Sequence, residues 1–380
     1  MEFNINHMAE EAIRAINERV RNLKHLNIAV VGKTGAGKST LINSVFRENL
    51  VETGIGKPVT STMRKISKEG FPLSIYDTPG FELGEDRQKT VRDELIGEIR
   101  KGIASKDIDK AIHCVWYCIN ANSNRIEPKE IEWLREFAEE NNVTQVPVII
   151  VLTQGFLKSK TKAMKKAIEA ENLDVIGVVP VLAQELIEED DEETIVYKSY
   201  GLDILIELMS NKLPNELRDT LQNVQKASLE SKKKYAQAAV AAAVTAAFGE
   251  GFTPVPFADA AMLVPTQIAM IASITAIFGL EVNKSIITGF VSSTVGTGGA
   301  TVLGRTVVSN IMKLIPGVGA AVGGAISGAT AGLITTALGE AYIKLMEMMY
   351  KGEIGKDTLL TSDGQAQLTQ LFKDELKKKK

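Results

Sequence analysis

The sequence predicts an α/β domain with a doubly wound, mostly parallel sheet, followed by an all-α C-terminal domain. Between residues 26 and 212, short runs rich in Val and Ile alternate with helical patterns, as in a parallel sheet covered by helices on both faces. Near residue 235 the composition changes, and few charged residues follow up to residue 350. The length of 380 residues suits two domains of ordinary size.

Six strands are expected in the α/β domain, at residues 27–31, 64–69, 73–77, 111–119, 146–152 and 176–182. Helices are expected at residues 38–46, 129–141, 160–171 and 201–212. An amphipathic helix is expected over residues 8–25, where Ile13, Ile16, Val20 and Leu23 recur at helical spacing. We expect this helix to pack on its own domain rather than on a membrane or a partner.

The expected organisation has five segments: an N-terminal amphipathic helix (1–25), the α/β domain (26–215), a charged helical linker (216–234), a Gly/Ala-rich hydrophobic helical domain (235–352) and a polar tail (353–380). The formal net charge of −3 gives no basic field for nucleic acid. Neither end shows a secretory signal or a lipidation motif, which predicts a cytoplasmic protein. Cys114 and Cys118 lie in an apolar run and are expected to be reduced core thiols.

A phosphate-binding loop is predicted at residues 32–39, which read Gly-Lys-Thr-Gly-Ala-Gly-Lys-Ser between an expected strand and an expected helix. The glycines let backbone N–H groups point at a phosphate, and the start of the helix adds a favourable partial charge. Lys38 is expected to reach the β- and γ-phosphates, and Ser39 to supply a hydroxyl to Mg²⁺. The nucleotide contacts expected here are Lys33, Thr34, Gly35, Ala36, Gly37, Lys38, Ser39 and Thr40.

A second phosphate-site motif, Asp-Thr-Pro-Gly, follows the third expected strand. Asp77 at the strand end is expected to hold Mg²⁺ through water, and the Gly80 N–H to respond to the γ-phosphate. The loop of residues 53–62 carries hydroxyl groups and suits a switch that closes over the metal. Either Thr60 or Thr62 supplies its Mg²⁺ ligand. We expect a metal site of Ser39, Thr62 and Asp77, and a catalytic set of Lys38, Thr62 and Gly80.

Residues 26–210 resemble the translation-factor-related GTPases, in particular the Era-like, septin, Toc and AIG1-like group. Three motifs carry this resemblance in order: Gly-Lys-Thr-Gly-x-Gly-Lys-Ser, Pro-Val-Thr-x-Thr and Asp-Thr-Pro-Gly. The whole chain resembles bacterial GTPases with a Gly/Ala-rich helical domain of unknown function and, distantly, the immunity-related GTPases. The resemblance implies a P-loop G domain that binds GTP or GDP with Mg²⁺, hydrolyses GTP slowly as a monomer, and forms a homodimer or larger assembly across the nucleotide face.

Two positions depart from the pattern of these GTPases. Their guanine-reading motif is Asn/Thr-Lys-x-Asp, in which the aspartate accepts hydrogen bonds from the ring N–H and the exocyclic amine. The matching residues here are Thr153, Gln154, Gly155 and Phe156, so the aspartate is missing. Thr153 is expected to tie this loop to the phosphate loop, Gln154 to lie along the base, and the Ala183 N–H to contact the base carbonyl.

The second departure concerns hydrolysis. Ras-like enzymes place a water-orienting Gln just after Asp-x-x-Gly, and this chain has Phe81 there. The charged neighbours that could activate water instead are Lys33, Glu82, Glu85 and Arg87, or a group supplied by a second copy.

The Gly/Ala-rich domain contains three uncharged stretches, at residues 260–280, 285–304 and 314–339, each at least 20 residues long. Its small residues also recur at the spacing that lets helices approach closely. Such close packing occurs in membrane bundles and in soluble bundles. Three readings stay open: conditional membrane association, which we favour, a soluble bundle, and a constitutive membrane span. Residues 256–279 and 316–339 form a weak internal repeat.

The sequence favours a GTPase whose nucleotide state controls self-association and a helical domain that contacts membrane lipid. The alternative is a soluble scaffold that binds nucleotide and assembles without turnover. A ribosome-assembly role is disfavoured by the acidic balance and by the lack of an RNA-binding appendage.

Overall fold

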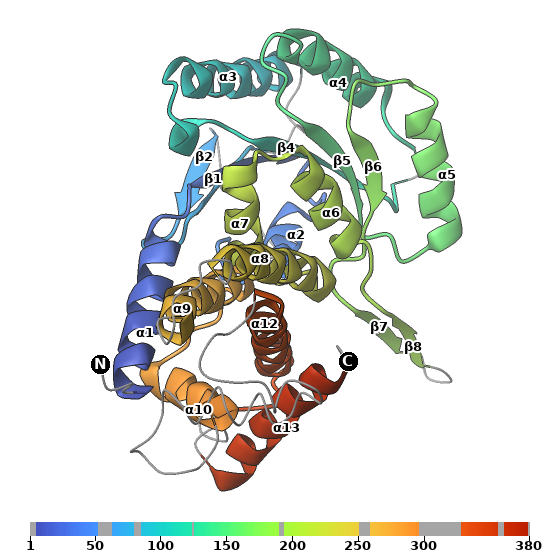
Figure 1. Cartoon of the computed structure of the whole chain (residues 1–380). Coiled ribbons are helices and arrows are strands. Elements are labelled where there is room, and N and C mark those ends of the chain that lie inside the picture. The colour runs from blue at the N-terminus through green and yellow to red at the C-terminus, as the bar shows by residue number, and fades with distance from the viewer. Residues whose placement is uncertain are drawn as a thin grey trace. The chain divides into compact units, whose positions relative to one another are not determined.

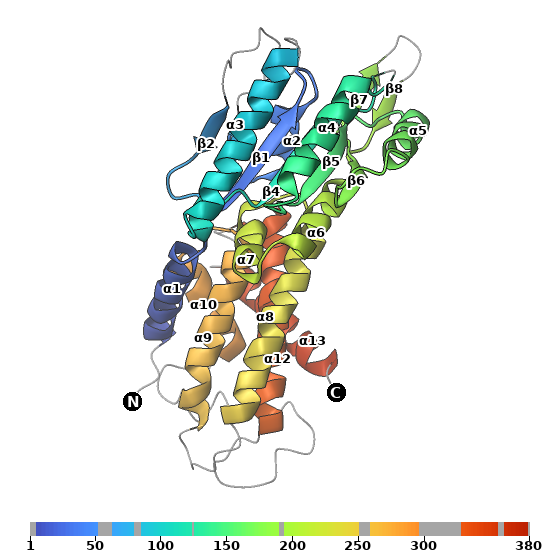
Figure 2. The ribbon, with the colours of Figure 1, turned by 90° about the horizontal axis from the view of Figure 1, so that it is seen from above.

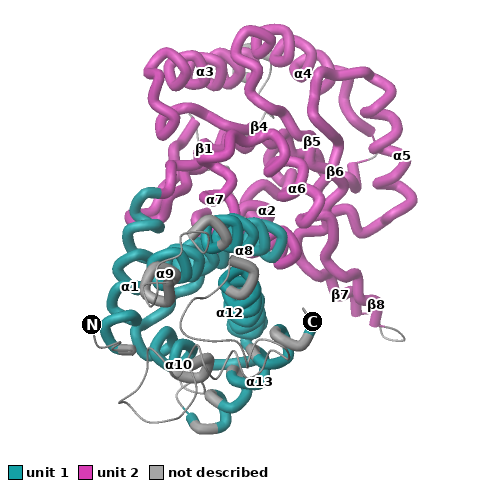
Figure 3. Tube along the Cα trace, in the orientation of Figure 1, with its two compact units in different colours: residues 1–22, 232–380 teal, residues 23–231 magenta. Residues whose placement is uncertain are grey.

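The computed structural model describes residues 5–51, 63–79, 85–123, 125–189, 194–250, 259–295, 328–355 and 361–378. The chain divides into two compact units (Figure 3). Unit 1 comprises Met1–Asn22 and Lys232–Lys380, and unit 2 comprises Leu23–Ser231. Unit 2 is the expected α/β domain and unit 1 is all-α, which confirms the predicted fold class.

Unit 2 is built on a six-stranded sheet with the order β2-β3-β1-β4-β5-β6. Every neighbouring pair is parallel except β2 and β3. All six expected strands are confirmed: β1 (Leu26–Gly32), β2 (Arg64–Ser67), β3 (Leu73–Asp77), β4 (Cys114–Asn120), β5 (Val148–Thr153) and β6 (Gly177–Pro180).

Helices cover both faces of this sheet (Figures 1 and 2). In β1, Leu26, Ile28 and Val30 face one core and Ala29 and Val31 the other, because side chains alternate along a strand. The first core is completed by α2 (Lys38–Val45), α6 (Leu202–Lys212) and α7 (Asn215–Val224). The second is completed by α3 (Glu85–Ala104), α4 (Pro128–Asn141) and α5 (Lys158–Glu169).

The boundary after the α/β domain differs from the expected one. The segment 216–234 was expected to be a linker, but most of it belongs to unit 2, because Leu217, Leu221 and Val224 of α7 are fully buried in the first core. The hairpin of β7 (Leu186–Glu189) and β8 (Thr194–Tyr197) and the short 3-10 helix η1 (Ile108–Lys110) were not expected.

Unit 1 consists of α1 (Ile5–Arg21), α8 (Leu229–Glu250) from Lys232 onward, α9 (Asp259–Phe278), α10 (Lys284–Val295), α12 (Gly328–Tyr350) and α13 (Ser362–Lys378). The amphipathic helix α1 packs on α9 and α10 and buries Ala9, Ala12 and Ile16. The expected polar tail is also structured, because α13 packs on α10 and α12. The N-terminal helix and the tail are therefore parts of the helical unit.

Buried polar groups and small residues hold the helices of unit 1 together. The Lys232 side chain is fully buried, and its Nζ donates to the carbonyls of Ile277 and Phe278 at the end of α9, 3.0 Å from each. Thr275 and Tyr342 share a buried hydrogen bond of 2.7 Å between α9 and α12. A Cβ at Gly339 would lie 2.5 Å from Val240 Cγ2, so α12 approaches α8 closely at this glycine.

The described part of the helical unit bears on two expectations. Within the described residues, no helix combines the length and the apolar character that a membrane crossing requires. The aligned glycines of the weak repeat have different settings, since Gly279 (φ 66) follows the end of α9 whereas Gly339 lies inside α12. Residues 316–327 of the repeat lie outside the described residues.

Candidate functional site

The predicted phosphate loop connects β1 to α2 at the carboxyl edge of the sheet, where open α/β sheets bind ligands. Gly35 (φ 75) and Gly37 (φ 76) adopt left-handed backbone conformations, and Gly37 is the N-cap of α2. A Cβ at Gly32 would overlap the carbonyl oxygen of Cys118, so the loop also requires glycine for its approach to β4. The loop therefore brings the start of a helix to one end of a glycine-rich turn.

Lys38 lies within this loop. Its Nζ donates to the Gly32 carbonyl at 2.7 Å and to the Lys33 carbonyl at 3.2 Å. Ser39 and Thr40 follow in the first turn of α2 and are half-buried. A cation inside a loop of backbone amides suits the binding of a polyphosphate, because the lysine ammonium acts as a point charge toward the phosphates.

Asp77 ends β3, beside Val30 of β1 in the sheet register. Its Oδ1 is buried and has no hydrogen-bond partner among the described residues. Burial raises the pKa of this carboxyl, while the charges of Lys38 and Arg64 oppose the rise. A buried carboxylate oxygen that no described residue satisfies, near the charge of Lys38, fits Mg²⁺, which prefers oxygen ligands and keeps several waters. Ser39 and Asp77 are therefore suited to hold the metal.

The loop after β5 is hydrogen-bonded to the phosphate loop through Thr153, as expected. The Thr153 hydroxyl lies 2.6 Å from the Ala36 carbonyl and 3.1 Å from the Ile119 carbonyl. Gln154 (φ 54) donates from Nε2 to the Gly35 carbonyl at 2.9 Å. These two contacts place residues 153–156 beside the phosphate loop, at the end that would face the base.

The loop after β6 is hydrogen-bonded to the loop after β5. The Gly155 N–H donates to the Val181 carbonyl at 3.0 Å, and the Tyr200 hydroxyl donates to the Gly155 carbonyl at 2.6 Å. Ala183 follows Val181 in the same loop and is half-buried. Phe156 is also half-buried, and its ring centroid lies 5.5 Å from that of Tyr197 in β8. An aromatic pair therefore occupies the position where related GTPases have a carboxylate.

The Lys33 side chain forms an ion pair beside the phosphate loop. Its Nζ lies 2.8 Å from a Glu127 carboxylate oxygen and 3.1 Å from one of Glu130, at the start of α4. Burial alone would lower the pKa of Lys33, but the two carboxylates raise it above its usual value. The side chain is engaged in this ion pair, which leaves its backbone as the part available to a phosphate.

A polar network behind the two loops was not predicted. Asn120 Nδ2 donates to Gln154 Oε1 at 3.3 Å, and Asn122 Nδ2 donates to the Gln154 carbonyl at 2.7 Å. Lys160 Nζ donates to the Asn122 carbonyl at 2.6 Å. The signal for it was a pair of asparagines at the carboxyl end of a buried strand, since Asn120 is the last residue of β4 and Asn122 follows it. This network fixes the position of Gln154.

Several predicted site residues lie outside the described residues, namely Thr60, Thr62, Gly80, Phe81 and Glu82. Glu85 and Arg87 lie in the first turn of α3. The thiols behave as expected: Cys114 and Cys118 are fully buried, and burial raises the pKa of each to about 12.

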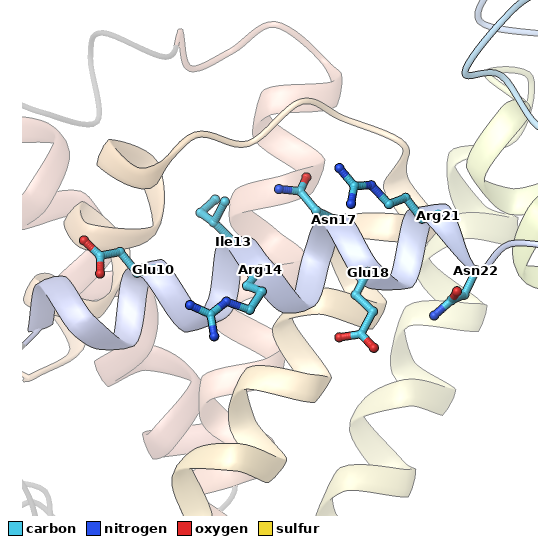
Figure 4. A pocket seen from close by; sticks show the side chains of 7 residues that line it. All are labelled: Glu10, Ile13, Arg14, Asn17, Glu18, Arg21 and Asn22. Carbon is cyan, nitrogen blue, oxygen red and sulfur yellow. The ribbon is translucent and has the colours of Figure 1, made fainter.

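A hollow of about 510 Å³ lies elsewhere, along α1 in unit 1 (Figure 4). It is lined by six residues of that helix and by Asn22, which directly follows it. Their side chains diverge, with Asn17 and Arg21 on one side of the helix and Glu18 on the other. They do not converge on one point, so this surface is no rival to the loop site.

Comparison with known proteins divides the chain in a similar way. Residues 22–200 match the Septin family, and residues 210–379 match a domain of unknown function, DUF697. Cell division control protein 10 of Candida albicans is 27% identical over 188 residues, covering 43% of this chain and 52% of that protein. Human Septin-9 is 26% identical over 201 residues, covering 46% and 33%.

The curated relatives extend well beyond the match, since the chain spans about half of the first relative's length and a third of the second's. Among solved structures, a dimerization-deficient mutant of Toc33 from Arabidopsis thaliana is 15% identical, with a TM-score of 0.35. That match covers 58% of this chain and 95% of the other. Cdc11 from Saccharomyces cerevisiae is 18% identical, with a TM-score of 0.32, and covers 52% and 95%.

Proposed function

We propose that this protein is a Mg²⁺-dependent GTPase. Its chain joins a septin-family P-loop GTPase domain to a DUF697 domain. Its nucleotide state would control self-association and the disposition of unit 1. One arrangement carries the proposal: Lys38 lies inside the phosphate loop, and the buried Asp77 carboxylate, at the end of the strand next to β1, has an oxygen that no described residue satisfies. GTP and GDP are the nucleotides, and Mg²⁺ is the metal.

The residues of the site have distinct tasks in this proposal. The backbone from Lys33 to Thr40 binds the phosphates, and Lys38 neutralises charge on the β- and γ-phosphates as the bond to the γ-phosphate breaks. Ser39, Asp77 and either Thr62 or Thr60 would hold Mg²⁺, which would add further neutralisation of that charge when bound. The Gly80 N–H would sense the γ-phosphate. Thr153, Gln154 and the Ala183 N–H would position the base.

We also propose that hydrolysis is slow in a monomer and faster on association. Phe81 has no group that orients water, and the Lys33 side chain is held by Glu127 and Glu130. A second copy that approaches the nucleotide face would have to supply or place the missing group. The membrane part of the proposal rests on the uncharged stretches of the Gly/Ala-rich region, through peripheral contact with lipid.

The alternative is a scaffold that binds nucleotide and assembles without turnover. Phe81 favours it, because the usual route to water activation is missing. Phosphate release from GTP with Mg²⁺, measured over a range of protein concentrations, separates the two. An association-activated GTPase gives a rate that rises more than linearly with concentration, whereas a scaffold gives no release at any concentration.

Variants give this experiment its controls. Lys38→Ala should abolish nucleotide binding and turnover. Asp77→Asn should weaken the binding of Mg²⁺, so that a higher Mg²⁺ concentration is needed for turnover. Lys162→Ala removes an exposed lysine of α5 and should leave both unchanged. Light scattering of the GDP and GTP-analogue states tests self-association. Sedimentation with anionic vesicles tests the lipid claim, which fails if no nucleotide changes the pelleted fraction.

A further inference from the structure

The base end of the site has Phe156 at the position where the GTPases that this sequence resembles have the aspartate that reads the 2-amino substituent of guanine. Guanine and hypoxanthine share the 6-oxo group and the ring N–H next to it, and they differ in the 2-amino group. To distinguish them, a protein must place an acceptor at that amine. The question is therefore which acceptors the two base loops offer.

The contacts of Thr153 and Gln154 settle which residues form the first loop. Thr153 lies 2.6 Å from the Ala36 carbonyl and Gln154 2.9 Å from the Gly35 carbonyl, so Phe156 comes two residues after the contact with the phosphate loop. Its ring packs on Tyr197, with planes tilted by 60°. This side chain offers apolar surface and no acceptor.

The other side-chain oxygens of these loops are engaged or exposed. Gln154 Oε1 accepts from Asn120 at 3.3 Å, and the Thr153 hydroxyl is directed at the carbonyls of Ala36 and Ile119. Among described residues 153–157 and 182–185, the single carboxylate is that of Glu185, which is exposed. A backbone N–H at Ala183 suits the 6-oxo group, and it would oppose the 6-amino group of adenine.

We infer that this site selects 6-oxopurine nucleotides without distinguishing guanine from hypoxanthine, and that Phe156 sets this specificity. The inference rests on the proposed function, since it concerns the base of the same nucleotide. The phosphate loop contributes equally to both ligands, because it contacts only the phosphates. Selection between them therefore depends on the base loops alone.

Displacement of a fluorescent methylanthraniloyl-GDP by GDP, IDP and ADP with Mg²⁺ tests the inference on the full chain. Diphosphates are used because they are not hydrolysed. GDP and IDP should compete with affinities within about threefold of each other, since Phe156 offers no acceptor to the 2-amino group. A preference for GDP over IDP of about tenfold or more would overturn the inference and leave the proposed function standing. Failure of all three to compete, or equal competition by ADP, would count against both.

Substitution of Phe156 supplies the converse test. Phe156→Asp should create a preference for GDP over IDP of about tenfold or more, because a carboxylate then accepts from the 2-amino group. Phe156→Leu is the matched control, which removes the contact with Tyr197 without adding an acceptor and should keep the two affinities equal. A GDP preference that appears in both variants would show that packing at position 156, rather than an acceptor, sets the selectivity.

Discussion

The two units of this chain differ in what some of their glycines and polar side chains contact. In unit 2, Gly32 and Gly201 lie against backbone carbonyls, and the polar side chains Thr153 and Gln154 bond one loop to another. In unit 1, Gly339 lies against side chains, and the buried Lys232 closes the end of a helix. The first arrangement fixes backbone positions around a site, whereas the second brings helices together.

This difference predicts which unit tolerates substitutions less well. A backbone carbonyl in a sheet cannot move without moving the strand, so contacts with it tolerate no change. Side chains around a helix change rotamer at low cost, and methionine does so most easily. Substitutions in unit 2 should therefore cost more than equivalent substitutions in unit 1. Both Trp residues, Trp116 and Trp133, lie in unit 2, so tryptophan fluorescence reports its unfolding separately.

The largest effect is expected at Gly201, which has φ 84 and whose Cβ would overlap the carbonyl oxygen of Pro180 in β6. Gly201→Ala should lower the free energy of unfolding by about 4 kcal/mol, since a left-handed backbone and a backbone overlap add. Gly70→Ala is the control, because Gly70 has φ 74 with nothing within 4 Å of an added Cβ. Urea unfolding followed by tryptophan fluorescence measures both. Equal losses would show that the backbone overlap costs nothing.

The pH dependence of unit 2 is the next largest effect. Burial lowers the pKa of His113 from 6.5 to about 4, although the hydrogen bond to the Ile108 carbonyl opposes the shift. Between these pKa values the unfolded chain binds a proton that the folded chain does not, so stability is full above pH 6.5 and falls as the pH drops. The loss should be about 3 kcal/mol by pH 4.

Comparison with His113→Gln isolates this contribution from the carboxylates that also titrate in acid. The variant should start less stable at pH 7 and should lose less stability on acidification. Urea unfolding at several pH values measures the slope for both proteins. Parallel slopes would assign the acid sensitivity to other groups, such as His25, whose pKa burial also lowers.

Lys232 provides the corresponding test in unit 1. Lys232→Met keeps most of the apolar stem but leaves the carbonyls of Ile277 and Phe278 without this donor, which should cost about 2 kcal/mol. Hydrogen exchange of α9 peptides measures the local loss. Lys234→Met, at an exposed position of the same helix, should leave that exchange unchanged. Faster exchange in unit 2 peptides alone would contradict the assignment of Lys232 to the helical unit.

The sequence predicts the sheet better than it predicts the boundaries or the site. All six strands were found because their Val- and Ile-rich runs are buried on both faces, as in β5. The charges of Glu216, Arg218 and Asp219 around the buried leucines of α7 give this helix the local pattern of a charged helical linker. The bond between Asn120 and Gln154 joins residues 34 apart in the chain, and only the parallel pairing of β4 and β5 brings them together. Local sequence patterns do not predict such long-range contacts.

The smallest effect is expected at Gly339, where the added methyl would lie 2.5 Å from Val240 Cγ2 and 2.9 Å from Met270 Sδ. Overpacking should destabilise α12, but alanine favours a helix over glycine, so Gly339→Ala should cost only about 1 kcal/mol. Val240→Ala makes room for the methyl, and the double variant should therefore be more stable than the sum of the two changes predicts. Hydrogen exchange of α12 measures all three. A loss at Gly339 as large as that at Gly201, with no relief from Val240→Ala, would mean that the helices of unit 1 are held as rigidly as the sheet. The distinction between backbone-limited and side-chain-limited packing would then fail.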